Sequence, residues 1–194
     1  AEARSVAISA IPAPGLVPIG AAFSVTAATP VVDIEGNFTS DYEEYLIVGN
    51  GLKCDTDSVY LRAQLKIDGA YQTDNYVFYV INGNSASTGV SAAVSGSGSV
   101  APSIMLSGFI LGNQSEAKGN VRVGVFTPTD TTSEKMVDIE FTGFARADNN
   151  ANQFKAVGSG RHKTSTAALT GVRIFFTEGN VIAGSFQLYG RKKL

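Results

Sequence analysis

The sequence predicts an all-β domain built as an antiparallel sandwich, and three observations lead to this prediction. Short stretches of alternating apolar and polar residues recur from residue 31 onward, and residues 59–67 are the clearest example. Gly, Asn, Asp or Thr bound each stretch, as expected where a chain turns. Gly supplies 21 of the 194 residues, and charged residues make up only 16% against a usual share of about 25%. Many short strands with few helical periods are typical of a sandwich or barrel.

The expected strands follow one another along the chain, over residues 45–48, 59–67, 76–81, 104–111, 121–125, 137–141, 154–157, 172–176 and 186–191. Asp68 and Gly69 follow the second of them and form a hairpin turn signal. A domain of this length buries roughly 70% of its unfolded surface, so a sizeable core is expected. The alternation assigns to this core Val59, Leu61, Leu65, Ile67, Val123, Ile139, Phe141, Val172, Ile174, Phe186 and Leu188.

Residues 1–30 differ from the rest because prolines interrupt an otherwise apolar segment. Proline fixes φ and removes a backbone donor, so this segment is expected to run extended. Two interpretations remain open: a leader strand lying on its own domain, or an N-terminal arm that docks on a neighbouring subunit. The second divides the chain into an arm, 1–30, and a sandwich domain, 31–194. Its candidate interaction residues are Ile11, Pro12, Pro14, Val17, Pro18, Ile19, Tyr42 and Tyr45.

Residues 85–102 consist almost wholly of Ser, Ala, Gly and Val, without a charge. Small residues bury little surface and lose much entropy on ordering, so a loop at the rim of the sandwich is expected. The alternative is a segment that becomes ordered only along a neighbouring subunit.

Catalytic and metal-binding patterns are absent from the sequence, so we expect no enzyme and no cofactor. Cys54 is the only cysteine, which excludes an intrachain disulfide and a thiolate zinc site, and adjacent Asp55 disfavours a thiolate. His162 is the only histidine, and its neighbours Arg161 and Lys163 in a glycine-containing stretch indicate a solvated loop residue. There is no nucleophile elbow and no phosphate-binding glycine loop.

Charge and hydropathy exclude two classes of partner. The formal net charge of −2 gives no general attraction to nucleic acid, and no apolar run approaches the ~20 residues needed to span a bilayer. The N-terminus lacks the order of a secretory signal, so synthesis in the cytoplasm is expected. Calcium stays open because carboxylates gather in the first half of the chain, at Asp33, Glu35, Asp41, Glu43, Glu44, Asp55, Asp57 and Asp68.

Two segments together resemble a known module. Residues 38–48 read FTSDYEEYLIV, and residues 177–190 read TEGNVIAGSFQLYG. This pair, with Leu61, Arg62 and the Asp68–Gly69 turn between, resembles a β-sandwich module of virion structural proteins of tailed phages. Within it, Tyr42 or Tyr45 is expected to close the domain end through a backbone acceptor. Gly179 and Asn180 are expected to turn the last hairpin, and Gly184 to permit a bulge.

The resemblance implies a jelly-roll-like sandwich and a structural protein of a bacteriophage particle. We expect a capsid decoration or head-fibre protein, or a tail or baseplate adaptor, that acts by packing on copies of itself and other virion proteins. Its location would be the virion, after synthesis in the host cytoplasm. The alternative is a lectin-like, carbohydrate-binding module for host attachment, which predicts exposed Tyr and Asn or Asp at one rim. No nucleic acid or membrane partner is expected.

Overall fold

The computed structural model describes residues 15–84, 101–114, 117–147 and 150–192. Within these residues the chain forms strands and no helix, so no described helix could cross a membrane. In chain order the strands are β1 (Leu16–Ser24), β2 (Val32–Glu35), β3 (Tyr42–Cys54), β4 (Leu61–Ile67), β5 (Ala70–Tyr71), β6 (Tyr76–Asn84), β7 (Ile104–Met105), β8 (Gly119–Phe126), β9 (Lys135–Ala147), β10 (Asn150–His162), β11 (Leu169–Phe176) and β12 (Val181–Lys192).

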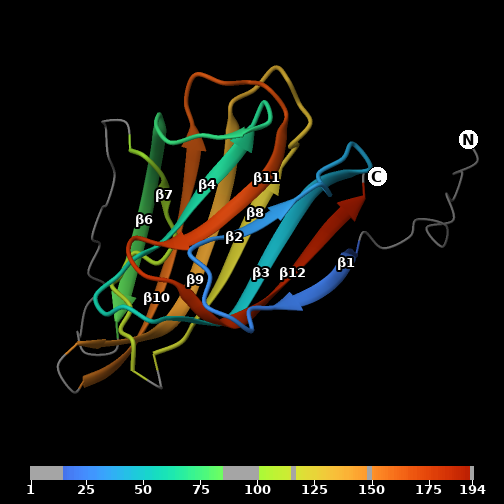
Figure 1. Ribbon diagram of the computed structural model, residues 1–194. Helices are drawn as coiled ribbons and strands as arrows, with labels where there is room; N and C mark the ends of the chain where they lie inside the picture. The colour runs from blue at the N-terminus through green and yellow to red at the C-terminus, as the bar shows by residue number, and fades with distance from the viewer. Residues whose placement is uncertain (1–14, 85–100, 115–116, 148–149, 193–194) are drawn as a thin grey trace, which may run out of the picture.

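The strands form two antiparallel sheets, which confirms the predicted jelly-roll-like sandwich (Figure 1). The seven-stranded sheet has the order β1-β12-β3-β8-β9-β10-β6, and the five-stranded sheet contains β2-β11-β4-β5 with β7 beside β4. Several neighbouring strands are distant in sequence: β12 pairs with β3, and β11 pairs with β4. Such non-local pairing is the usual consequence of Greek-key connections.

The core lies between the two sheets, where the inward side chains of both meet. In β4 the odd positions from Leu61 to Ile67 are buried and the even positions are half-buried, as period-two alternation requires. Each of the eleven predicted core residues is buried, which confirms that the inward faces were assigned correctly.

Two predicted turn features are confirmed. Asp68 and Gly69 have φ angles of 52° and 77°, and they connect β4 to β5 in the tight turn that the dipeptide predicts. At Gly184 the register of β12 against β3 shifts, and the residue has a φ of 129°. A Cβ atom there would lie 2.6 Å from Leu52, so this bulge requires glycine.

Two sequence expectations about connections are corrected. Gly179 and Asn180 do not close a hairpin, because β11 belongs to the five-stranded sheet and β12 to the seven-stranded sheet. They turn the chain from one sheet to the other, and Asp55 fixes this crossover by accepting hydrogen bonds from the backbone and side-chain nitrogens of Asn180 at 2.8 and 2.7 Å. The strand expected over 104–111 ends at Met105, and the residues that follow, including Gly108 with a φ of 63°, form no strand.

Part of the expected N-terminal arm is a strand of the domain. β1 pairs antiparallel with β12 along the edge of the seven-stranded sheet, and Phe23 stacks on Phe186 with ring centroids 5.5 Å apart. Residues 16–24 therefore have the geometry of a leader strand lying on its own domain. Residues 1–14, and residues 85–100 of the expected small-residue loop, lie outside the described residues.

Candidate binding face on the seven-stranded sheet

The outer face of the seven-stranded sheet carries most of the exposed apolar surface. Among the described residues, the large hydrophobic side chains that are exposed number eight, and all lie on strands of this sheet. Three lie on the edge strand β1, at Leu16, Val17 and Phe23. The other five lie on β6, β8, β9 and β10, at Tyr79, Phe126, Met136, Phe144 and Val157. These five occupy outward positions of the sheet, whereas Phe23 of β1 stacks on the core residue Phe186. The five exposed apolar groups on the outer face indicate a contact surface.

Four of these side chains form what we call the apolar strip: Tyr79, Phe126, Met136 and Val157. Phe126 and Met136 each lie one residue beyond the paired residues Val125 and Val137, so they are cross-strand neighbours. Tyr79 on β6 and Met136 on β9 line a hollow of about 150 Å³, together with Ser159 and with Arg161, which lies opposite Met136 on β10. The apolar strip therefore has large side chains on either side of a shallow depression.

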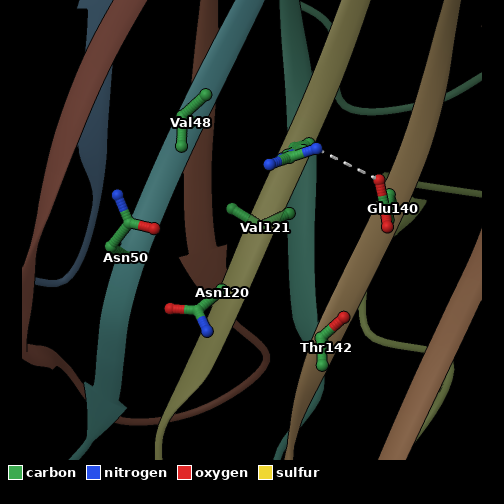
Figure 2. A pocket seen from close by; sticks show the side chains of 7 residues that line it. Val48, Asn50, Asn120, Val121, Glu140 and Thr142 are labelled. Carbon is green, nitrogen blue, oxygen red and sulfur yellow. Dashed lines mark ion pairs between the residues drawn. The ribbon is translucent and has the colours of Figure 1, made fainter.

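A polar groove of about 320 Å³ lies on the same face, on β3, β8 and β9 (Figure 2). The register places Val48, Arg122 and Glu140 in one row across the sheet and pairs Asn120 with Thr142 in a second row. Asn50 lines the groove from the irregular part of β3 between Gly49 and Leu52. Val121 also lines it. The polar groove combines two amides, a hydroxyl, a guanidinium and a carboxylate on regular strands, which hold side chains more rigidly than loops do.

Glu140 is held ionised in the polar groove. Its carboxylate lies 2.8 Å from the Lys155 ammonium and 3.7 Å from the Arg122 guanidinium, the pair marked in Figure 2. The hydrogen bond from Lys155 and the two positive charges lower the pKa of Glu140, against a smaller opposing effect of burial. Glu140 therefore serves as a hydrogen-bond acceptor at neutral pH, and it lacks the raised pKa that a general acid needs.

Asn120 has a fixed orientation. Its Oδ1 atom accepts a hydrogen bond from the backbone N–H of Gly51 at 2.9 Å. This N–H is available because the register of β3 against β8 shifts between Gly49 and Leu52, and Gly51 has a φ of 64°. With the oxygen occupied, the Nδ2 amide group is the part of Asn120 left to donate into the polar groove.

The outer face of the five-stranded sheet has a different character, because it carries two ion pairs, between Arg173 and Asp33 and between Lys66 and Glu35. Arg173 contacts both carboxylate oxygens of Asp33 at 2.8 Å, and its guanidinium lies 3.9 Å from the ring centroid of Tyr71. Lys66 and the Tyr71 hydroxyl both donate to Glu35, at 2.7 and 2.8 Å. Two of the carboxylates considered for calcium thus have protein partners. The described residues contain no cluster of three or more potential metal ligands.

His162 is not the solvated loop residue that the sequence suggests. It is the last residue of β10, is buried, and contacts Tyr76 edge to face with ring centroids 5.2 Å apart. Burial lowers its pKa, because the cation would lose its hydration. The glycines before it belong to β10, and a Cβ on Gly158 would lie 2.1 Å from the carbonyl oxygen of Tyr79, so this strand packs closely against β6.

Cys54 is a buried thiol at the end of β3. Its sulfur donates a weak hydrogen bond to the carbonyl oxygen of Glu178 at 3.5 Å, and burial raises its pKa. Its charge state is therefore neutral at physiological pH, which agrees with the inert thiol expected from the sequence.

The predicted interaction residues are not brought together in one place. Val17, Pro18 and Ile19 lie on β1, whereas Ile11, Pro12 and Pro14 lie outside the described residues. Tyr42 is half-buried at the start of β3. Tyr45 requires a correction: its ring is fully buried against Phe38 and Tyr42, so it is a core residue that no partner can reach.

The polar groove was not predicted from the sequence. Arg122 and Glu140 are at outward positions of predicted strands, whereas Asn50, Asn120 and Thr142 lie just beyond the ends of the predicted ranges. Arg122 alternates with Val121 and Val123, and Glu140 alternates with Ile139 and Phe141. That alternation marks them as solvent-facing, but only the pairing of three strands shows that they share one hollow.

Comparison with known proteins identifies no family. No family model matches the chain, and no curated protein matches it. Among solved structures, it is similar to exo-inulinase from Aspergillus awamori, with 12% identity, 91% of this chain and 29% of that chain covered, and a TM-score of 0.35. It is also similar to galectin LEC-6 from Caenorhabditis elegans, with 13% identity, 85% of this chain and 94% of that chain covered, and a TM-score of 0.35. For the CBM2 module of the evolved Dit of Lactobacillus casei BL23 phage J-1, the identity is 8%, the coverage is 84% of this chain and 70% of that chain, and the TM-score is 0.23. Scores this low assign no function to the chain.

Proposed function

We propose that this chain is a structural component of a bacteriophage particle that acts by packing, not by catalysis. The observation that carries the proposal is the apolar strip, which leaves four large side chains in water on an otherwise regular sheet. Exposed apolar groups of this kind are stabilised when a partner covers them, because burial removes them from water. The partners proposed are neighbouring copies of the chain and other virion proteins.

The phage assignment is supported by the two segments that resemble virion modules. Both are strands of one structural unit: β3, from the first segment, pairs with β12, from the second, and Tyr45 lies opposite Gly190. The first segment also closes its own end, since the Tyr45 hydroxyl donates to the carbonyl oxygen of Thr39 at 2.9 Å. The segments thus form a contiguous framework, as a shared module would.

The groups most suited to catalysis support a non-enzymatic role. Glu140 has a lowered pKa, and Cys54 has a raised one, so neither is tuned toward its reactive form. Neither ring nitrogen of buried His162 has a hydrogen-bond partner among the described residues. A nucleophile, a base and a stabilising group do not converge on one cavity in this part of the chain.

The docking arm remains part of the proposal for residues 1–14 only. Deleting residues 1–30 would also remove β1 and the Phe23 ring that stacks on Phe186, so it would damage the sandwich itself. Deleting residues 1–14 is the appropriate test. We expect an unchanged melting temperature and reduced incorporation of the truncated chain into the particle. This expectation is the same for a capsid decoration or head-fibre protein and for a tail or baseplate adaptor.

Incorporation of charged variants tests the packing proposal. Met136→Glu and Val157→Glu place a charge on the apolar strip, where burial in an interface would be costly. Both variants should fold, because these positions are exposed, yet fail to enter particles. Ala70→Glu, at an exposed position of β5 in the five-stranded sheet, is the matched control and should enter normally. Normal incorporation of both strip variants would refute the assignment of this face.

A further inference from the structure

We infer that the polar groove binds carbohydrate, with Phe144 as the ring on which a sugar stacks. The ligand class is a short oligosaccharide of pyranose units. The inference does not depend on the packing role of the apolar strip, because the groove residues Asn50, Asn120, Arg122, Glu140 and Thr142 are not part of that strip.

The hydrogen-bonding groups of the polar groove suit a sugar because donors and acceptors alternate within it. A sugar hydroxyl both donates and accepts, so its site needs both kinds of group at fixed positions. Asn120 presents its Nδ2 donor because its oxygen is occupied by the Gly51 N–H. Glu140 presents a carboxylate acceptor, and it stays ionised beside Lys155 and Arg122. Figure 2 shows Asn120 and Glu140 on the neighbouring strands β8 and β9 around the same hollow.

The spacing of the polar groove also suits a pyranose ring. Asn50, Asn120 and Thr142 lie on three adjacent strands, and neighbouring strands are separated by about 4.8 Å. Hydroxyl groups on opposite sides of one sugar ring are separated by a similar distance. A hollow of about 320 Å³ is at the lower end of the range for small-molecule sites, which are about 300–1,000 Å³.

Phe144 completes the site because it extends the same face of β9. It lies two residues beyond Thr142, about 7 Å along the strand, so both side chains project to the same side of the sheet. Its side chain is 44% exposed. The apolar C–H face of a pyranose packs against an aromatic ring and thereby covers it. An exposed ring beside fixed polar groups is the combination that separates a sugar site from a merely solvated surface.

The charge of the polar groove disfavours nucleic acid. Its carboxylate takes up part of the positive charge of Arg122 and Lys155, whereas phosphate contacts need cations free of such partners. An apolar peptide is disfavoured because the two rows across the groove carry Asn, Thr, Arg and Glu around Val48.

Titration with defined sugars, followed by ¹H–¹⁵N NMR, tests the inference. The probes are tri- and tetrasaccharides of glucose, galactose and N-acetylglucosamine, with uronic acid oligomers as the acidic arm. At least one probe should shift the side-chain amide signals of Asn120 at millimolar concentration. If no probe shifts these signals, the inference is wrong. Preference for the acidic arm would show that Arg122 binds the sugar carboxylate and would keep the site as assigned.

Two variants with matched controls locate the sugar. Asn120→Asp keeps an oxygen for the Gly51 N–H but removes the donor, and Asn37→Asp makes the same change elsewhere. Phe144→Ala removes the ring, and Phe126→Ala removes an exposed ring from the apolar strip of the same sheet. Asn120→Asp and Phe144→Ala should each weaken binding by about tenfold, while the controls bind as the unmodified chain does. Unchanged sugar affinity in both groove variants would overturn the site. Loss of particle incorporation in Phe126→Ala with unchanged sugar affinity would support the packing role of the apolar strip and leave the sugar site as assigned.

Discussion

Tyr45 and Thr39 form a closed hydrogen-bonded pair at the start of β3. The Tyr45 hydroxyl donates to the carbonyl oxygen of Thr39 at 2.9 Å and accepts from its backbone N–H at 2.6 Å. The connection between β2 and β3 is thereby tied to a ring that lies in the core. A residue that the sequence marks as a possible interaction residue instead holds the end of the domain together.

Removing this hydroxyl should destabilise the domain without changing its fold. In Tyr45→Phe the ring still packs against Phe38, but both backbone groups of Thr39 lose their partner. We expect the free energy of unfolding to fall by about 1–3 kcal/mol, measured by urea denaturation. Tyr79→Phe, at an exposed position, is the control and should be neutral. Equal stability of the two variants would show that the pair contributes nothing.

Truncation of core side chains should be costly on both sheets. Leu65→Ala and Ile174→Ala remove fully buried groups of β4 and β11, so each should lower the free energy of unfolding by about 2–5 kcal/mol through lost burial and the cavity left behind. Val157→Ala, on the exposed face of β10, should cost less than about 0.5 kcal/mol. Thermal unfolding measures all three, and a larger loss in Val157→Ala would mean that the faces are reversed.

The stability of the domain should fall on mild acidification because of His162. Its pKa in the folded chain lies below the ordinary value of 6.5, so the unfolded chain takes up the proton first as pH falls. The contribution of neutral His162 to the free energy of unfolding is therefore complete above pH 6.5. It declines as the pH drops toward the lower pKa of the folded chain. The carboxylates of Asp74 and Glu134 oppose this shift, while burial dominates.

His162→Phe isolates this effect, because it keeps an aromatic contact with Tyr76 and removes the titrating group. Unfolding free energies of both proteins are compared between about pH 7 and pH 5. The unmodified chain should lose stability across this interval, and the variant should lose less. Parallel curves would assign the acid sensitivity to other groups.

Gly158 should be required for the docking of the edge strand β6. Its missing side chain lets the Tyr79 carbonyl approach, and a Cβ atom would lie 2.1 Å from that oxygen. Gly158→Ala should displace β6 and cost about 1–3 kcal/mol. Hydrogen exchange is the measurement: amides of β6 should exchange faster, while those of β3 stay protected. Unchanged protection of β6 would contradict the close packing.

The sequence predicts those features of the fold that depend on residues close together in the chain. The other features depend on packing between residues that are distant in the chain. The inward positions of β4 could be predicted because alternating apolar and polar residues indicate a strand with one buried face. The signal at Gly179 and Asn180 is ambiguous, since the same residues turn a hairpin or a crossover, and only the partner of β12 decides. The glycines before His162 suggested a loop, whereas close contact with β6 explains them.

The polar groove illustrates the same limit. Asn120 is oriented only because an irregularity in β3 presents the Gly51 N–H to this residue of β8, which is 69 positions away in the chain. No local pattern encodes that pairing, so the alternation marks Arg122 and Glu140 as solvent-facing but does not show that they belong to one site.

Oxidation of Met136 in assembled particles tests the central claim most directly. The chain has two methionines: Met136 on the apolar strip is 50% exposed, and Met105 on β7 is 7% exposed and serves as the internal control. Hydroxyl-radical footprinting with mass spectrometry compares the isolated chain with the particle. We predict that Met136 reacts rapidly in the isolated chain and becomes protected in the particle, while Met105 reacts slowly in both. Equal reactivity of Met136 in the two states, or absence of the chain from purified particles, would contradict the account.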